Sequence, residues 1–268
     1  MTDGDAVTTG ARLDTSVAHN ARVWNYWIGG RDHYEVDQRV GEHIAGMFPV
    51  IREVARADRG FLARVVRHLT AEQGLRQFLD VGTGLPTVEN THEIAQRIAP
   101  ESRVVYVDND PIVLVHARSL LTSSPEGVTD YVDADVHDPD AILRRAADTL
   151  DLDRPVALMM LGIVNFVMDT GEARDIVRRL MAALPSGSHL VLTHPTTDPE
   201  VGGEGNVAAM EFWNAHATPP ITARGRAEIA SFLDGLDVAE PGLVPCSQWR
   251  AEPGAAPVPQ FGALAVKR

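Results

Sequence analysis

The sequence predicts an α/β fold built on a mostly parallel sheet with one reversed strand. From Gln77 onward, short apolar runs alternate with segments of helical periodicity, as in parallel strands joined by helices. Near the end of the chain, the segments at about 238–244 and 260–266 read as strands, but the connection between them has no helical pattern. Strands joined without a helix pair antiparallel, so one strand of the sheet should be reversed.

The segment ahead of the sheet predicts an N-terminal helical extension. Residues 1–16 are polar and predict a disordered tail, and residues 17–70 predict a helical cap on a domain formed by residues 71–268. In the cap we expect helices over about 20–28, 34–47 and 51–69. Asn20 is the expected cap of the first helix, and Gly29 and Gly30 are expected to end it.

The aromatic-rich segment from Val23 to Tyr34 allows two interpretations. In one, a helix packs its apolar face on the core. In the other, which we favour, the segment forms a lid with a hinge at Gly29 and Gly30 and brings Tyr26 or Arg31 over the site.

The elements of the alternating region follow from apolar runs and capping signals. Strands are expected over about 77–81, 103–108, 131–136, 155–161 and 188–194, before the two closing strands. Cap signals open four of the intervening helices: Asn90 with Glu93, Asp110 with Pro111, Asp138 with Pro139, and Asp169 with Glu172. Two more helices are expected over about 207–216 and 223–236.

Carboxylates and glycines follow the ends of three successive strands. Asp80 precedes Gly82 and Gly84, Asp108 ends the next strand, and Asp135 ends the third. The carboxyl ends of parallel strands share one edge of a sheet, where nucleoside cofactors bind with an acid on the ribose hydroxyls. A single Gly-x-Gly is better explained by an ordinary tight turn, but three acidic strand ends favour a nucleoside site.

One N-terminal segment and three segments of the alternating core carry a resemblance to a known family. Residues 21–32 (ARVWNYWIGGRD), together with residues 78–87 (FLDVGTGLPT), 90–93 (NTHE) and 106–111 (YVDNDP), resemble a bacterial family of uncharacterised S-adenosylmethionine-dependent methyltransferases. The resemblance runs from about Ala18 to the end of the chain. It implies the class I methyltransferase (Rossmann-like) fold with a seven-stranded, mostly parallel sheet and one antiparallel strand.

The resemblance also implies a cofactor, S-adenosyl-L-methionine, and a set of residues that bind it. Asp80, Gly82, Thr83 and Gly84 should surround its methionine part. Asp108 should accept hydrogen bonds from the ribose hydroxyls. The remaining contacts fall at the ends of the following strands: Asn109, Asp135 and Val136 around the adenine, and Leu161 and Gly162 near the sulfonium. Pro86 stands where many methyltransferases have a third glycine, and Arg31 could supply the charge for the methionine carboxylate.

Methyl transfer from a sulfonium requires alignment and exclusion of water, and a general base only if the acceptor must lose a proton. His194, at the expected end of the fifth strand, is our first candidate base, with a solvated loop histidine as the alternative. Tyr26, His33 and His216 are further candidates. Phe212 and Trp213 either line an acceptor pocket or pack in the core.

Composition narrows the function classes. The net charge of −13 argues against nucleic-acid partners, and no apolar run approaches the length of a membrane span. The one cysteine, Cys246, excludes an intramolecular disulfide and a Cys-rich metal site, and we expect a cytoplasmic protein. His92 and His137 have no partners at metal-ligand spacing, so we expect no metal.

The sequence therefore predicts a methyltransferase acting on a small-molecule acceptor. A non-catalytic S-adenosylmethionine-binding protein and a nicotinamide-dependent oxidoreductase are the alternatives. The acceptor, its reacting atom and the oligomeric state stay open.

Overall fold

The computed structural model describes residues 15–87, 89–120 and 122–268, so residues 1–14 of the predicted tail lie outside the described part. Its centre is one sheet. In spatial order the main strands are β4 (Val128–Asp133), β3 (Arg103–Asp108), β2 (Gln77–Val81), β5 (Ala157–Leu161), β6 (His189–Pro195), β10 (Gln260–Val266) and β8 (Asp237–Val238). The first five strands in this order, β4, β3, β2, β5 and β6, pair in parallel. β10 runs antiparallel to β6 and β8. The predicted mostly parallel sheet with one reversed strand is confirmed.

One predicted strand is divided. The segment expected as a strand over about 238–244 forms β8 and, separately, β9 (Val244–Pro245), which pairs with β10. A turn separates them, closed by a hydrogen bond from Gly242 N to Ala239 O at 2.9 Å. Pro241 lacks a backbone donor and Gly242 has a φ of +91°, so this stretch cannot continue the ladder.

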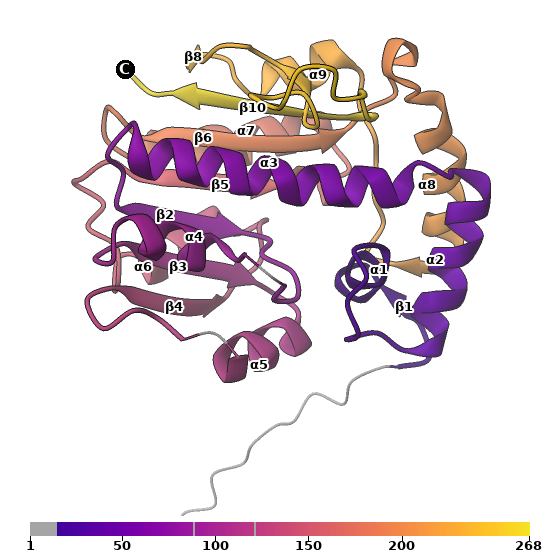
Figure 1. The fold of residues 1–268 in the computed structure, drawn as a ribbon, viewed down its shortest axis with the longest axis horizontal. Coiled ribbons are helices and arrows are strands. Elements are labelled where there is room, and N and C mark those ends of the chain that lie inside the picture. Colours follow the sequence, from indigo (N-terminus) through magenta and orange to yellow (C-terminus); the bar gives the residue numbers. More distant parts are fainter. Residues whose placement is uncertain (1–14, 88, 121) are drawn as a thin grey trace, which may run out of the picture.

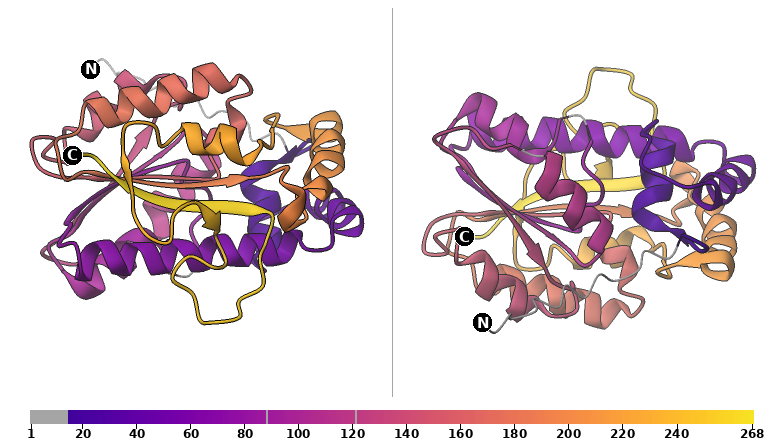
Figure 2. Two further views of the ribbon diagram at one scale, coloured as in Figure 1. Left: turned by 90° about the horizontal axis from the view of Figure 1, so that it is seen from above. Right: turned by 90° about the horizontal axis from the view of Figure 1, so that it is seen from below.

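Helices cover both faces of the sheet (Figure 2). α3 (Ile51–Ala71) and α4 (Thr91–Ile98) lie on one face, and α6 (Pro139–Ala146), α7 (Thr170–Ala182) and α9 (Arg226–Ser231) lie on the other. α5 (Pro111–Leu120) borders β3 and β4. Short 3-10 helices η1 (Val164–Phe166) and η2 (Pro199–Val201) follow β5 and β6.

Most predicted helix starts are confirmed. Asn90 and Glu93 form a capping box at α4, and Asp138 and Asp169 each accept a backbone N–H at the start of α6 and α7. Asp110 accepts from Ile112 N at 2.8 Å.

The expected cap of the first helix is wrong. α1 (Asn20–Trp27) is preceded by His19 in an extended conformation, because His19 belongs to the short strand β1 (Ala18–His19). The last helix is also shorter than the predicted 223–236. Thr196 and Arg224 form a bridge that holds the chain extended just before α9 begins.

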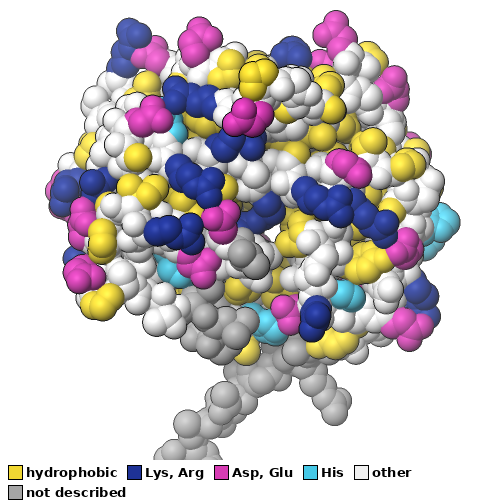
Figure 3. Space-filling view, in the orientation of Figure 1, with side chains coloured by type: hydrophobic (Ala, Val, Ile, Leu, Met, Phe, Trp, Pro, Cys, Tyr) yellow, Lys and Arg dark blue, Asp and Glu magenta, His cyan; other side chains and the backbone are white. Residues whose placement is uncertain are grey.

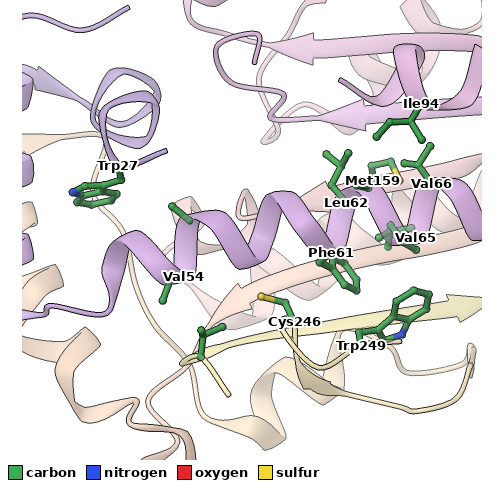
Figure 4. Packing of buried hydrophobic residues seen from close by; sticks show 14 of the residues in the cluster. Trp27, Val54, Phe61, Leu62, Val65, Val66, Ile94, Met159, Cys246 and Trp249 are labelled. Carbon is green, nitrogen blue, oxygen red and sulfur yellow. The ribbon is translucent and has the colours of Figure 1, made fainter. Parts of the chain in front are cut away.

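The core has two halves, one on each face of the sheet. In the first, α3 packs its apolar side on the strands, and Figure 4 shows Phe61, Leu62, Val65 and Val66 projecting from this helix. Cys246 is fully buried there, and burial raises the pKa of its thiol.

The N-terminal elements and the insertion after β6 lie together beyond the carboxyl ends of the parallel strands (Figure 1). They comprise β1, α1, α2 (Glu35–Met47), α8 (Glu204–His216) and β7 (Ala217–Thr218). β1 pairs in parallel with β7, so that Ala18 faces Ala217 and His19 faces Thr218. His43 of α2 stacks on Phe212 of α8, with ring centroids 4.0 Å apart.

Helix α1 is fixed by buried contacts. Val23 and Trp27 belong to the core, and the indole nitrogen of Trp27 donates to Gly41 O at 3.1 Å. Arg22 and Asp37 form a buried ion pair at 2.9 Å. The packing interpretation therefore describes this helix in the structure, while the hinge motion stays a prediction. Among the described residues, no helix has the length and apolarity needed to cross a membrane.

Candidate functional site

Two cavities meet at the loop after β2. The inner cavity extends beneath α1, α3 and α8 and includes Trp24, Arg59, Asp80 and Trp213 in its lining. The outer cavity lies over the ends of β3 and β4 and is lined by residues that include Asp108 and Asp135. The two share six lining residues: Asn20, Ala21, Gly82, Gly84, Gly162 and Phe166. Figure 3 shows a hollow near the middle of this face, with hydrophobic side chains inside it.

The loop after β2 needs its glycines. Gly82 and Gly84 have φ values of +76° and +65°, a backbone conformation that residues with a side chain rarely adopt. A Cβ on Gly82 would lie 2.5 Å from Cδ1 of Ile163. Gly82 N donates to Val107 O at 2.8 Å, so the loop is fastened to the neighbouring strand.

Asp108 both holds this loop and lines the outer cavity. Its Oδ2 accepts from Gly84 N and its Oδ1 from Asp110 N, each at 2.9 Å. Burial raises the pKa of Asp108, and these two hydrogen bonds offset only part of the effect. A carboxylate can accept about four hydrogen bonds, so Asp108 retains acceptor positions for a ligand.

Asn109, Asp135 and Val136 also line the outer cavity, next to Asp108. Asn109 Nδ2 donates to Asp135 Oδ2 at 2.8 Å, and His137 N donates to Asp135 Oδ1 at 2.9 Å. Although partial burial opposes it, the hydrogen bonds from His137 and Asn109 hold the pKa of Asp135 below its ordinary value.

Asp80 is a buried carboxylate at the junction of sheet and inner cavity. It is 5% exposed and accepts from the Thr91 hydroxyl at 2.7 Å. Burial raises its pKa from 3.8 to about 6, against the opposing effects of Thr91 and of the Arg59 charge. Thr83, Leu161 and Gly162 line the same cavity.

Two residues of α3 that line the inner cavity were not predicted from the sequence. Arg59 lines the cavity and donates from Nη2 to Glu89 O at 2.9 Å. Asp58 is 6% exposed and accepts from Gln260 Nε2 at 2.6 Å. Among the described residues that line this cavity, Arg59 is the one cation, and Asp58 and Asp80 are the acids.

A third overlooked residue is Asn165, which follows β5 in η1. It is buried and lines the inner cavity, and its Oδ1 has no hydrogen-bond partner. A buried acceptor without a donor is costly in a folded protein. The cavity therefore presents an acceptor that a bound molecule could satisfy.

His194 lies in the core, outside the lining of both cavities. It is fully buried, so the solvated-loop alternative is wrong. Arg224 Nη1 donates to Nε2 at 2.8 Å, and Nδ1 donates to Pro195 O at 2.7 Å. Burial lowers the pKa of His194 to about 3. With both nitrogens engaged, this histidine orders the loop that carries Arg224.

The other candidate bases and the two expected carboxylate contacts also lie outside the linings. Tyr26 faces α2 and α3, where its hydroxyl bonds to Glu42 and accepts from Arg52. His33 packs edge-on against Tyr26, and Arg31 is exposed. The helical face that carries Tyr26 is turned from the cavity, while Asn20, Trp24 and Ile28 of the same segment line it.

The two aromatic residues of α8 differ. Trp213 lines the inner cavity, with its indole nitrogen donating to Pro219 O at 2.7 Å. Phe212 instead stacks between His43 and His216, outside the lining. Within the described residues, no three His, Cys, Asp or Glu side chains gather closely enough to hold a metal ion.

Comparison with known proteins adds the family. The family model described as S-adenosyl methyltransferase matches residues 6–267. No curated protein matches the chain.

Solved structures resemble the whole chain. A DUF574 family protein from Streptomyces avermitilis is 45% identical, with a TM-score of 0.91 over 96% of this chain and 100% of its own. A candidate methyltransferase from Thermobifida fusca is 32% identical, with a TM-score of 0.86 over 98% of this chain and 100% of its own. Human N-acetylserotonin methyltransferase, at 12% identity and a TM-score of 0.52 over 93% of this chain and 63% of its own, shares the fold. With its sheet order, its glycine loop and a family match along almost its entire length, the chain belongs to the S-adenosyl methyltransferase family.

Proposed function

We propose that this protein binds S-adenosylmethionine across the two cavities and transfers its methyl group to a small-molecule acceptor. The observation that carries the proposal is the junction of the cavities at the Gly82–Gly84 loop, with acids on the ends of the neighbouring strands. A nucleoside with a charged tail needs such a site: one compartment for the nucleoside and one for the tail.

The outer cavity suits the adenosine part. Asp108 would accept from the ribose hydroxyls, since its acceptor capacity is not exhausted by Gly84 and Asp110. Asn109, Asp135 and Val136 would surround the adenine, with Asp135 accepting from its amino group. The low pKa of Asp135 keeps it ionised for that contact.

The inner cavity suits the methionine part, whose carboxylate and ammonium group need opposite charges. We assign the carboxylate to Arg59, in place of the exposed Arg31. Asp80 would face the ammonium group, whose positive charge compensates the burial of this acid. The loop formed by Gly82, Thr83 and Gly84 would pass beneath the methionine part of the cofactor. Leu161 and Gly162 would lie close to its sulfur.

The bound cofactor would supply an activated methyl group on a sulfonium. The protein would then position the acceptor and exclude water, for which the buried walls from α1, α3 and α8 are suited. A non-catalytic binder would use the same cofactor contacts without an acceptor. A nicotinamide enzyme is disfavoured by the reversed β10.

Calorimetric titration with S-adenosylmethionine, S-adenosylhomocysteine and NAD tests the proposal. We expect the first two to bind and NAD not to bind. Turnover of S-adenosylmethionine with a panel of small-molecule acceptors then separates an enzyme from a binder. NAD binding in preference to both sulfur compounds would contradict the proposal.

A pair of arginine variants tests the methionine end. Arg59→Ala should weaken binding about ten- to a hundredfold, because a charge-assisted hydrogen bond contributes about 1.5–3 kcal/mol. Arg67→Ala is the matched control: Arg67 lies on the same helix and contacts Glu89 at 2.9 Å, but it does not line the cavity. Equal losses in both variants would assign the effect to the Glu89 loop.

A further inference from the structure

We propose that the part of the inner cavity between α3 and α8 binds a small, uncharged ring compound bearing a hydroxyl group, whose O–H donates a hydrogen bond to Asp58. This inference rests on the proposed function and names the acceptor class.

The position of Asp58 within an apolar enclosure is the first observation. The walls of this region are aromatic and aliphatic: Trp27, Ile51, Val54, Ala209, Trp213 and Ile221. Asp58 lies one turn along α3 from Val54 and one turn before Leu62, on the apolar side of the helix. A flat ring would pack against such walls, and a single polar group on the ring could form a hydrogen bond with Asp58.

The hydrogen bonds to Asp58 leave room for a ligand. Gln260 donates to Oδ1 at 2.6 Å, and the Thr193 hydroxyl also bonds to the carboxylate. Gln260 Nε2 lies 3.4 Å from Thr193 Oγ1, so the amide orients that hydroxyl. These two donors supply about half of what a carboxylate accepts.

The surplus of acceptors in the cavity favours a donating ligand. Asn165 Oδ1 is buried without a donor in the same cavity. Of the described lining residues, Arg59 alone is cationic, and the methionine carboxylate would occupy it. A ligand with an O–H group supplies the hydrogen-bond donor that these acceptor side chains lack.

Charge balance favours an uncharged acceptor over an ammonium ion. In their ionised forms Asp58 and Asp80 carry two negative charges, and Arg59 carries one positive charge. The methionine part of the cofactor adds a carboxylate, an ammonium and a sulfonium, a net single positive charge. The site is then neutral, and a cationic acceptor would leave a buried charge unpaired, which is costly.

Asp58 also provides a place for the proton. As the acceptor oxygen bonds to the methyl carbon, the S–CH₃ bond breaks, its electron pair stays on sulfur, and the O–H proton passes to the Asp58 carboxylate. The sulfonium thus becomes a neutral thioether, and the Asp58 carboxylate becomes a neutral carboxylic acid, so the net charge of the site is unchanged. Burial raises the pKa of Asp58, which makes the carboxylate a better proton acceptor.

The test uses pairs of ring compounds on protein saturated with S-adenosylhomocysteine. Ligand-observed NMR titrations compare p-cresol with toluene and 2-naphthol with naphthalene. Benzylamine is titrated separately on protein saturated with S-adenosylmethionine, which keeps the sulfonium charge. We expect at least one hydroxyl compound to bind about tenfold or more tightly than its partner, because of the added hydrogen bond. Absence of any hydroxyl preference, no binding of either hydroxyl compound, or binding of benzylamine to the S-adenosylmethionine complex more tightly than either hydroxyl compound binds overturns the inference.

Asp58→Asn assigns the preference to the acid. It should remove most of the hydroxyl preference while leaving the affinity for S-adenosylhomocysteine within about twofold of wild type. Glu53→Gln, an exposed carboxylate on the same helix, is the control and should retain the preference. A preference unchanged in Asp58→Asn overturns the inference, whereas wild-type protein that fails to bind S-adenosylhomocysteine defeats the proposed function itself.

Discussion

Replacing Asp80 with asparagine should stabilise the cofactor-free protein while weakening its cofactor binding. The side chain is 5% exposed, and burial raises its pKa from 3.8 to about 6. Asparagine has the same shape and can still accept from the Thr91 hydroxyl, which lies 2.7 Å from the Asp80 carboxylate. The substitution therefore removes the charge with little change in packing.

The sign and size follow from proton linkage. The folded pKa is raised, so the folded protein holds this proton over a range in which the unfolded chain has lost it. The contribution of Asp80 to the free energy of unfolding is therefore greatest below pH 3.8, and it falls as the pH rises toward about 6. A shift of about 2 pKa units corresponds to about 3 kcal/mol once both states are ionised.

Urea unfolding of wild type and Asp80→Asn, from about pH 5 to about pH 8, measures this effect. The advantage of the variant should grow by about 1–1.5 kcal/mol over that range and reach about 3 kcal/mol at the upper end. The variant should also bind S-adenosylmethionine about tenfold or more weakly, since it cannot pair with an ammonium group. A pH-independent stability difference, or a variant less stable than wild type at about pH 8, would refute the reasoning.

Three further predictions follow from contacts of the described residues. Asp108→Ala should weaken cofactor binding by about a hundredfold, more than a ribose contact alone implies, because Asp108 also holds Gly84 N at 2.9 Å; calorimetry giving wild-type affinity in the folded variant would exclude the assignment. Asp37→Ala should lower the free energy of unfolding by about 3–5 kcal/mol, since it leaves the buried Arg22 without its ion-pair partner; a loss under about 1 kcal/mol in urea unfolding would contradict this. Given the net charge of −13, no DNA or RNA should bind specifically in a low-salt gel-shift assay, and a salt-resistant complex would overturn that expectation.

The parts of the site nearest in sequence to the strands were the most predictable. Asp80 and Asp108 lie at the carboxyl ends of β2 and β3, and Asp135 lies two residues after β4, so parallel pairing alone brings them to one edge. The caps at Asn90 and Asp138 were equally accessible, because each depends on contacts within one helical turn. Such local rules need no knowledge of how distant segments pack.

The contributions from helices that dock from elsewhere were not predictable in the same way. Whether Tyr26 or Trp24 faces the cavity depends on the rotation of α1 against α2, and the residue pattern within α1 does not reveal that rotation. The position of Asp58 did leave a signal. It falls in register with Val54, Leu62 and Val65 on the apolar side of α3, where an acid is out of place unless it has partners or a function.

The pairing of β1 with β7 has a consequence for how the molecule is assembled. Ala18 and Ala217 are separated by roughly 200 residues, and closing so long a loop is entropically unfavourable until the intervening chain is folded. Most of the outer cavity is lined by the strand–helix units between β2 and α6, which leave the ribosome in succession, and Gly162, Phe166 and Pro219 are added later. The inner cavity has to wait for α8 to meet the segment synthesised first. Most of the nucleoside compartment can therefore form during synthesis, whereas the compartment for the acceptor is completed among the last steps of folding.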